Sequence, residues 1–206
     1  MVLNFLRSNN YDTRIRLNFN QPEISRITMS PKHTTIILLH VIIFLFIGHE
    51  GFAKNKPFSY RRDGISFTLQ PDWKVIANDS IGNTAYYFSA ERAADQATGL
   101  ITVTWINKIE DPVKMIDIHQ KSMKEANIYR NHGIEFTSIG AENFSGIKAK
   151  SCQYSTYVSD KKLDGQIYCF NTEQKTITIF FQTGTKDKRV NEKAFDLFKL
   201  TFNCRE

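Results

Sequence analysis

Few residues of this 206-residue chain have the types and spacing that catalysis requires. His119 is the first candidate, because an imidazole titrates near neutral pH and can act as a general acid or base. It falls, however, in the apolar stripe of a predicted helix, together with Met115 and Met123. A histidine in such a stripe is more often a hydrogen-bonded part of the core. We therefore interpret His119 as structural.

Carboxylates offer a second kind of chemistry, because two acids brought together by folding can hydrolyse a substrate. Glu91 and Asp95 lie in a polar, alanine-rich segment, and they would have to meet Glu135 or Glu142. Isolated charges on a polar loop are usually solvated surface. A secreted hydrolase with a carboxylate-based site is therefore kept as an alternative function.

Three cysteines follow residue 53: Cys152, Cys169 and Cys204. In an oxidising compartment two of three cysteines usually pair. We predict a disulfide between Cys152 and Cys169, because a hairpin turning at residues 159–162 would place them opposite each other. The alternative is that all three are small buried hydrophobic residues.

The remaining motifs of known chemistry are not found in the sequence. It has no Cys-x-x-Cys, and only His119 and His132 follow residue 53 as nitrogen ligands, so no metal site is expected. No glycine-rich phosphate loop or nucleophile elbow occurs either. We predict no catalytic residues and no cofactor, and enzymatic activity is the less favoured interpretation.

An apolar run at residues 36–47 indicates export. It is too short for a hydrocarbon layer that needs about 20 apolar residues, but it has the length of a signal-peptide core. Gly51 and Ala53 fit a cleavage site, and Met29 would give an ordinary basic start. We expect residues 1–28 to be an upstream extension or mis-start, residues 29–53 a signal peptide and residues 54–206 one domain. The alternative is a cytoplasmic tail on a single-pass anchor.

The charge balance argues against a nucleic-acid partner. The chain has 27 basic and 21 acidic residues, and removing residues 1–53 takes 5 and 3 of these, which leaves a net charge of +4. The charges alternate in sign, whereas nucleic-acid binding needs a concentrated basic stripe. A length near 150 residues suits one domain.

The hydrophobic periods predict strands, one helix, more strands and a closing helix. Asp111 and Pro112 form a cap and first turn for the first helix, which should end before Asn131. Consecutive strands with short polar turns predict an antiparallel meander. The fold class is therefore α+β, an antiparallel β-sheet with helices packed on its faces. The predicted strands are 65–69, 85–89, 101–106, 134–139, 147–158, 165–170 and 176–183, and the closing helix is 190–199.

Five aromatic residues could form a binding platform: Trp73, Tyr86, Tyr87, Phe88 and Trp105. Aromatic faces give a large contact area for a sugar or a peptide. Alternation along a strand sends every second ring inward, however, so we favour core packing. We expect at least one of Tyr86 and Tyr87 to point outward.

Residues 63–73, Asp-Gly-Ile-Ser-Phe-Thr-Leu-Gln-Pro-Asp-Trp, resemble the opening of PsbP-like domains, in which a glycine, a short apolar strand, a proline and a tryptophan recur in this order. The resemblance to this Mog/PsbP-like superfamily covers residues 58–204. It implies an α/β/α sandwich that serves as a binding or accessory module. The photosystem role of some members is not carried over, because the chain shows no matching docking or metal-binding residues.

These observations favour an exported, non-enzymatic binding or accessory protein of the cell envelope, located in the periplasm or outside the cell. It would contact an envelope or extracellular protein through a sheet face or through the loops at one end of the sheet. We expect no nucleic-acid partner and no stable membrane span after signal cleavage. Capture of a small ligand is the third possibility.

Overall fold

The computed structural model describes residues 56–205 except 83, 95–96, 127–128 and 130–131. The predicted signal peptide and the start at Met29 lie outside the described residues. Within them, no helix is both long and apolar enough to cross a membrane.

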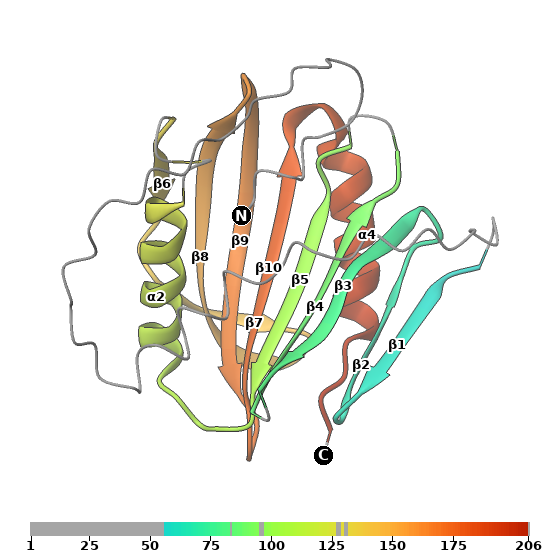
Figure 1. The fold of residues 1–206 in the computed structure, drawn as a ribbon, viewed down its shortest axis with the longest axis vertical. Helices are drawn as coiled ribbons and strands as arrows, with labels where there is room; N and C mark the ends of the chain where they lie inside the picture. Colours follow the sequence, from blue (N-terminus) through green and yellow to red (C-terminus); the bar gives the residue numbers. More distant parts are fainter. Residues whose placement is uncertain (1–55, 83, 95–96, 127–128, 130–131, 206) are drawn as a thin grey trace, which may run out of the picture.

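Two antiparallel sheets form the framework (Figure 1). The smaller is a hairpin of β1 (Phe58–Arg62) and β2 (Ile65–Leu69). The larger has the strand order β3-β4-β5-β10-β9-β8-β6, with β7 also paired to β8. Its strands in chain order are β3 (Trp73–Ile81), β4 (Ala85–Arg92), β5 (Leu100–Ile106), β6 (Ile134–Phe136), β7 (Gly140–Phe144), β8 (Ile147–Val158), β9 (Lys161–Asn171) and β10 (Thr176–Gly184).

Helices α2 (Pro112–Glu125) and α4 (Lys188–Thr201) cover opposite faces of the large sheet (Figure 1). On one face, Met115 and Ile116 of α2 pack with Cys169 of β9. On the other, α4 packs together with the β1–β2 hairpin. The predicted α+β class, an antiparallel sheet with helices on its faces, is confirmed.

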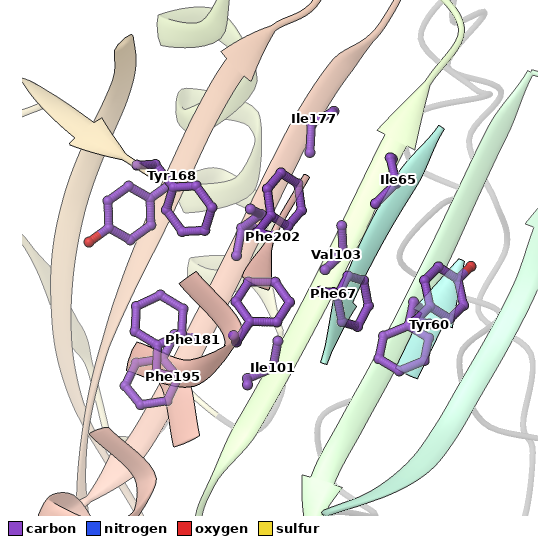
Figure 2. Packing of buried hydrophobic residues seen from close by; sticks show 14 of the residues in the cluster. Tyr60, Ile65, Phe67, Ile101, Val103, Tyr168, Ile177, Phe181, Phe195 and Phe202 are labelled. Carbon is purple, nitrogen blue, oxygen red and sulfur yellow. The ribbon is translucent and has the colours of Figure 1, made fainter. Parts of the chain in front are cut away.

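The main core lies on the α4 side of the sheet and is rich in phenylalanine (Figure 2). Phe195 of α4 stacks on Phe181 of β10, with ring centroids 4.2 Å apart and an angle of 10° between the planes. Phe67 of β2 lies 4.8 Å from Phe198 by the same measure. Because burying such a ring stabilises the fold by about 1.5 to 3 kcal/mol, these contacts attach both α4 and the hairpin.

The capping residues predicted for the first helix act as expected. The Asp111 carboxylate accepts a hydrogen bond of 2.8 Å from the backbone N–H of Val113, and Pro112 occupies the first turn. The helix ends at Glu125, before Asn131 as predicted, and the N–H of Ala126, in an extended conformation, bonds to the carbonyls of residues 122 and 123.

Turn geometry explains where β9 begins, and one predicted strand is divided in two. The β8–β9 turn consists of Ser159 and Asp160 alone, with φ of 48° and 62°, and Val158 pairs directly with Lys161. Two positive φ values are those of a tight type I′ hairpin, so β9 starts four residues before the predicted strand. The predicted strand at residues 134–139 is β6, which stops at Phe136 and is followed by a separate strand, β7.

Gly165 lies opposite Tyr154, whose ring covers it. A Cβ at Gly165 would come within 2.3 Å of that ring. The Tyr154 hydroxyl donates to Gln182 Oε1 at 3.1 Å, so the ring has little freedom to move. We expect Gly165→Ala to lower the free energy of unfolding by about 1 to 3 kcal/mol, as measured by urea denaturation. Gly140→Ala is the control, since nothing lies within 4 Å of its Cβ; equal losses in both variants would contradict the prediction.

Candidate functional site

Polar side chains line the part of the α4-side sheet face that α4 leaves uncovered. Cross-strand pairing arranges them in rows, because directly paired residues share a face of the sheet. The first row is Glu135 on β6, Ser155 on β8, Asp164 on β9 and Thr183 on β10. The second row is Gln153 on β8, Gln166 on β9 and Phe181 on β10.

These rows form the floor of a groove of about 470 Å³. Lys188 and Glu192, from the first turns of α4, form part of its wall. Phe181 closes the floor where the sheet passes under α4, since its ring stacks on Phe195. The groove therefore offers amide, hydroxyl and carboxylate groups beside an apolar wall.

Glu142 of β7 lies beside the second row, and three donors hold its carboxylate. Ser151 Oγ donates at 2.6 Å, Gln166 Nε2 at 2.7 Å and the Tyr168 hydroxyl at 3.3 Å. Burial, together with the neighbouring Glu142 charge, raises the pKa of Tyr168, so this phenol stays protonated and donates. The residue Glu142 is nevertheless exposed to solvent.

The groove is acidic, although the chain as a whole carries a net charge of +6. Three acids, Glu135, Asp164 and Glu192, line it against the single cation Lys188. Lys162 lies 3.6 Å from the Asp164 carboxylate, and Lys188 lies 3.8 Å from that of Glu192. Because these pairs are well exposed, each contributes little free energy and leaves the acids open to a partner.

The carboxylates considered from the sequence are not brought together with Glu91. Four strands separate β4 from β6 in the sheet order, so Glu91 and Glu135 are about 24 Å apart at about 4.8 Å per strand spacing. Glu91 instead pairs with Lys74, with 2.7 Å between Oε1 and Nζ. Asp95 lies outside the described residues. Pairing of Glu91 with Glu135 or with Glu142, which lies on β7 beyond β8, is therefore wrong.

The histidines take no part in the groove. His119 is half-buried on α2, on the opposite face of the sheet, and His132 is exposed. Among the described residues, no group of three His, Cys, Asp or Glu side chains is placed to hold a metal ion.

Cys152 and Cys169 lie under α2, but not directly opposite each other. Cys152 faces Ile167 and Cys169 faces Lys150, because the two-residue turn sets a different register from the expected one. Both side chains are thiols in this structure. Gln120 Nε2 donates to Cys152 Sγ at 3.3 Å, and Thr178 Oγ1 donates to Cys169 Sγ at 3.5 Å. Burial raises the pKa of Cys152 and that of Cys169, the latter to about 11.

The disulfide between Cys152 and Cys169 stays a prediction. In the observed register the two cysteines are diagonal neighbours, with Cα atoms about 7 to 8 Å apart, and a disulfide requires about 4.4 to 6.8 Å. If the alternative of small buried hydrophobic residues holds, both thiols react with a thiol reagent once the protein is denatured without reductant. A mass lower by two hydrogens in the denatured, unreduced protein would show the disulfide instead.

The aromatic residues proposed as a platform are core residues. Phe88, Trp73 and Trp105 are buried, and so is Tyr87 on the opposite face. Tyr86 is half-buried: it stacks on Trp105 at 5.4 Å, and the guanidinium of Arg62 lies 4.6 Å from its ring. The outward-pointing tyrosine expected from the sequence is therefore Tyr86, whose side chain is only partly exposed to solvent.

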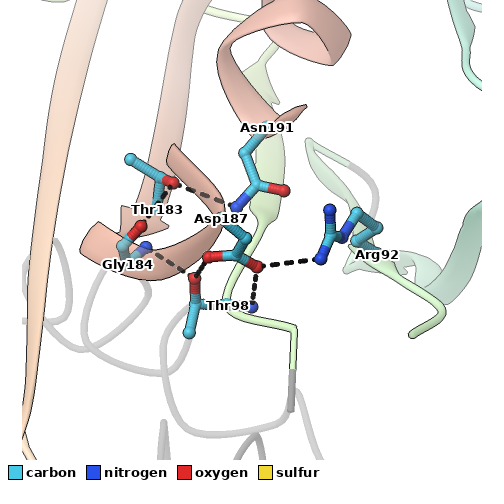
Figure 3. A network of polar contacts seen from close by, with 6 residues as sticks. All are labelled: Arg92, Thr98, Thr183, Gly184, Asp187 and Asn191. Carbon is cyan, nitrogen blue, oxygen red and sulfur yellow. Dashed lines mark hydrogen bonds and ion pairs between the residues drawn. The ribbon is translucent and has the colours of Figure 1, made fainter. Parts of the chain in front are cut away.

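A polar network at one end of the sheet positions α4 beside the groove (Figure 3). Asp187 lies just before the helix, and its carboxylate accepts a hydrogen bond of 2.9 Å from the backbone N–H of Thr98. The Arg92 guanidinium forms an ion pair with the same carboxylate at 3.1 Å. Thr98 Oγ1 also donates to this carboxylate, and it accepts from the N–H of Gly184. From the first turn of α4, Asn191 Nδ2 donates to Thr183 Oγ1 at 3.0 Å. The sequence offered no signal for this network beyond an aspartate before a helix, because Thr98 lies 89 residues from Asp187 in the chain.

Fold and groove together define a class: an antiparallel α+β domain with helices on both faces and a polar groove beside the closing helix. No family model matches the sequence, and no curated protein matches it significantly.

Solved structures similar to the chain include PsbP (CyanoP) from the cyanobacterium Synechocystis sp. PCC 6803, with a TM-score of 0.48, 16% identity and coverage of 78% of this chain and 98% of that one. For LpqN of Mycobacterium tuberculosis, described as involved in cell envelope biogenesis, the TM-score is 0.47 and the sequence identity is 12%. The match covers 72% of this chain and 88% of that one. For a Pseudomonas aeruginosa protein of unknown function, described as a putative regulator, the TM-score is 0.43 and the sequence identity is 15%. The match covers 73% of this chain and 98% of that one. At these identities, the likeness to these structures concerns the fold alone.

Proposed function

We propose that this protein is an exported accessory protein of the cell envelope that binds a partner protein through the polar groove. The observation that supports this proposal is the exposed set of hydrogen-bonding side chains presented by β6, β8 and β9 beside α4. Regular strands fix the positions of these side chains, and binding groups held on rigid elements lose little entropy when a partner arrives.

A carboxylate-based hydrolase is the second candidate, and one observation favours it. Glu135 and Asp164 share a row on either side of Ser155, two strand spacings or about 10 Å apart. Hydrolases with two acids normally keep one of them protonated by burying it. Glu135 is exposed, and Asp164 lies 3.6 Å from Lys162. These surroundings suit binding better than acid catalysis.

The two candidates make different predictions for conservative variants. If the groove is catalytic, Glu135→Gln and Asp164→Asn must each abolish turnover of a glycan, ester or peptide substrate by the purified domain. If the groove binds a partner, the wild-type domain shows no turnover to abolish.

Photocrosslinking in the native host tests the proposed binding function. We place p-benzoylphenylalanine at Gln153, which is exposed and faces the groove, and as control at Lys150, which is exposed on the same strand but faces the α2 side. We expect an adduct with one defined envelope protein from position 153 and none from position 150. Equal adducts from both positions, or none from positions 153, 155 and 166, would overturn the proposal.

The proposed export leads to a separate prediction about the N-terminus of the mature protein. N-terminal sequencing of the protein from the envelope fraction should give a chain that begins near Lys54. Replacing Met29 should abolish its production if translation starts there, whereas replacing Met1 should leave it unchanged. Recovery of the uncleaved 206-residue chain from the cytoplasmic fraction would contradict this prediction.

A further inference from the structure

We infer that the segment of the partner that enters the groove is an extended stretch of chain carrying two basic residues. This inference rests on the proposed function and adds the chemistry of the partner. It is carried by the charges, the spacing and the unfilled hydrogen-bonding capacity of the acids along the groove.

The sign of the charge comes first. Three acids and one cation line the groove, and Glu142 adds a fourth acid beside its second row. The neighbouring cations are Lys162, 3.6 Å from Asp164, and Lys199, whose Nζ lies 5.5 Å from the ring centroid of Tyr168. Because the chain as a whole is basic, this acidic strip is a local feature. A partner gains electrostatic complementarity here by presenting lysine or arginine.

Glu142 is the best-defined acid of this strip. An ionised carboxylate has about four lone-pair positions, and Ser151, Gln166 and Tyr168 fill three of them. Since the residue is exposed, the remaining position is open to a donor from outside. A lysine or arginine would complete the set with a charge-assisted hydrogen bond, and Glu142 would not need to reorganise.

The spacing of the acids indicates an extended segment. Glu135 lies in the row of Ser155, whereas the Glu142 carboxylate bonds to Ser151 and to Gln166, which pairs with Gln153. This carboxylate is therefore two to four residues further along β8, or about 7 to 14 Å at about 3.4 Å per residue. An extended chain matches this distance with basic residues at positions i and i+2 to i+4.

The floor of the groove meets a partner with side chains, because the edge of β8 beside it is occupied by β6 and β7. Residues 147–151 of β8 pair with β7, and residues 154–156 pair with β6. Between them, the carbonyl of Gln153 accepts from the N–H of Thr137. A partner strand therefore cannot add to β8 itself, and a partner in the groove contacts the side chains of its polar floor.

The test identifies the crosslinked segment itself. Adducts formed at positions 153 and 166 are digested, and the attached partner peptide is sequenced by mass spectrometry. We expect lysine or arginine at two positions, i and i+2 to i+4, near the attachment point. A segment without basic residues overturns the inference but leaves the proposed function in place, whereas the absence of any adduct overturns both.

Charge variants supply a second measurement. With a synthetic peptide that copies the sequenced segment, we expect Glu142→Gln to weaken binding about tenfold, the effect of losing one charge-assisted hydrogen bond. Raising the salt concentration should weaken wild-type binding as well. Glu173→Gln, an exposed acid at the β9–β10 turn, is the control and should bind as wild type. Binding that responds neither to Glu142→Gln nor to salt overturns the inference.

Discussion

Phe198→Ala is expected to lower the free energy of unfolding by about 3 to 5 kcal/mol, the range for removal of a buried phenylalanine ring. The ring is fully buried on α4, and its centroid lies 4.8 Å from that of Phe67 and 5.6 Å from that of Phe202. It therefore joins the helix to the β1–β2 hairpin and to the end of the chain. Removing it leaves a cavity among rings that regular elements hold in place.

Urea denaturation measures this loss, and the slope of free energy against urea should stay the same if the variant still folds to one compact state. Leu200→Ala is the matched control on the same helix, because Leu200 is 82% exposed, and it should change the stability by less than about 0.5 kcal/mol. A small loss for Phe198→Ala, comparable with that of Leu200→Ala, would mean that α4 is not anchored through this ring.

Much of the fold was predictable from the sequence, because it depends on local patterns. The alternation of Ile101, Val103 and Trp105 predicted β5, and all three side chains are fully buried. The stripe through Ala194 and Phe198 predicted α4. In each case a hydrophobic period of two or of 3.6 residues indicates which face of the strand or helix is buried. That period is visible within a single segment of the sequence.

The groove was not predictable, because it depends on pairing between distant segments. Glu135, Ser155 and Asp164 form a row only when β6, β8 and β9 pair in this register, and each of them alone looks like an ordinary exposed polar residue of a strand. The register depends on a tight turn at Ser159 and Asp160. A hairpin was predicted at residues 159–162, but the observed turn is two residues long, which explains why Cys152 does not face Cys169.

Asp187→Ala is expected to lower the free energy of unfolding by about 3 kcal/mol, because it leaves a largely buried cation without its partner. The side chains of Arg92 and Asp187 are only 13% and 12% exposed, and their charged atoms are 3.1 Å apart. The substitution also removes the acceptor for the N–H and the hydroxyl of Thr98. The Arg92 segment would then lose its attachment to the start of α4.

A double-mutant cycle separates the ion pair from these other contacts. If the charge left on Arg92 causes the loss, the double variant Arg92→Ala/Asp187→Ala should lose much less stability than the sum of the losses in the two single variants. The exposed pair of Lys188 and Glu192 provides the control, and Glu192→Gln should change the stability by less than about 1 kcal/mol. Additive losses in the cycle would show that Asp187 acts mainly through Thr98. In that case the backbone of the loop, rather than the buried charge pair, fixes where α4 begins beside the groove.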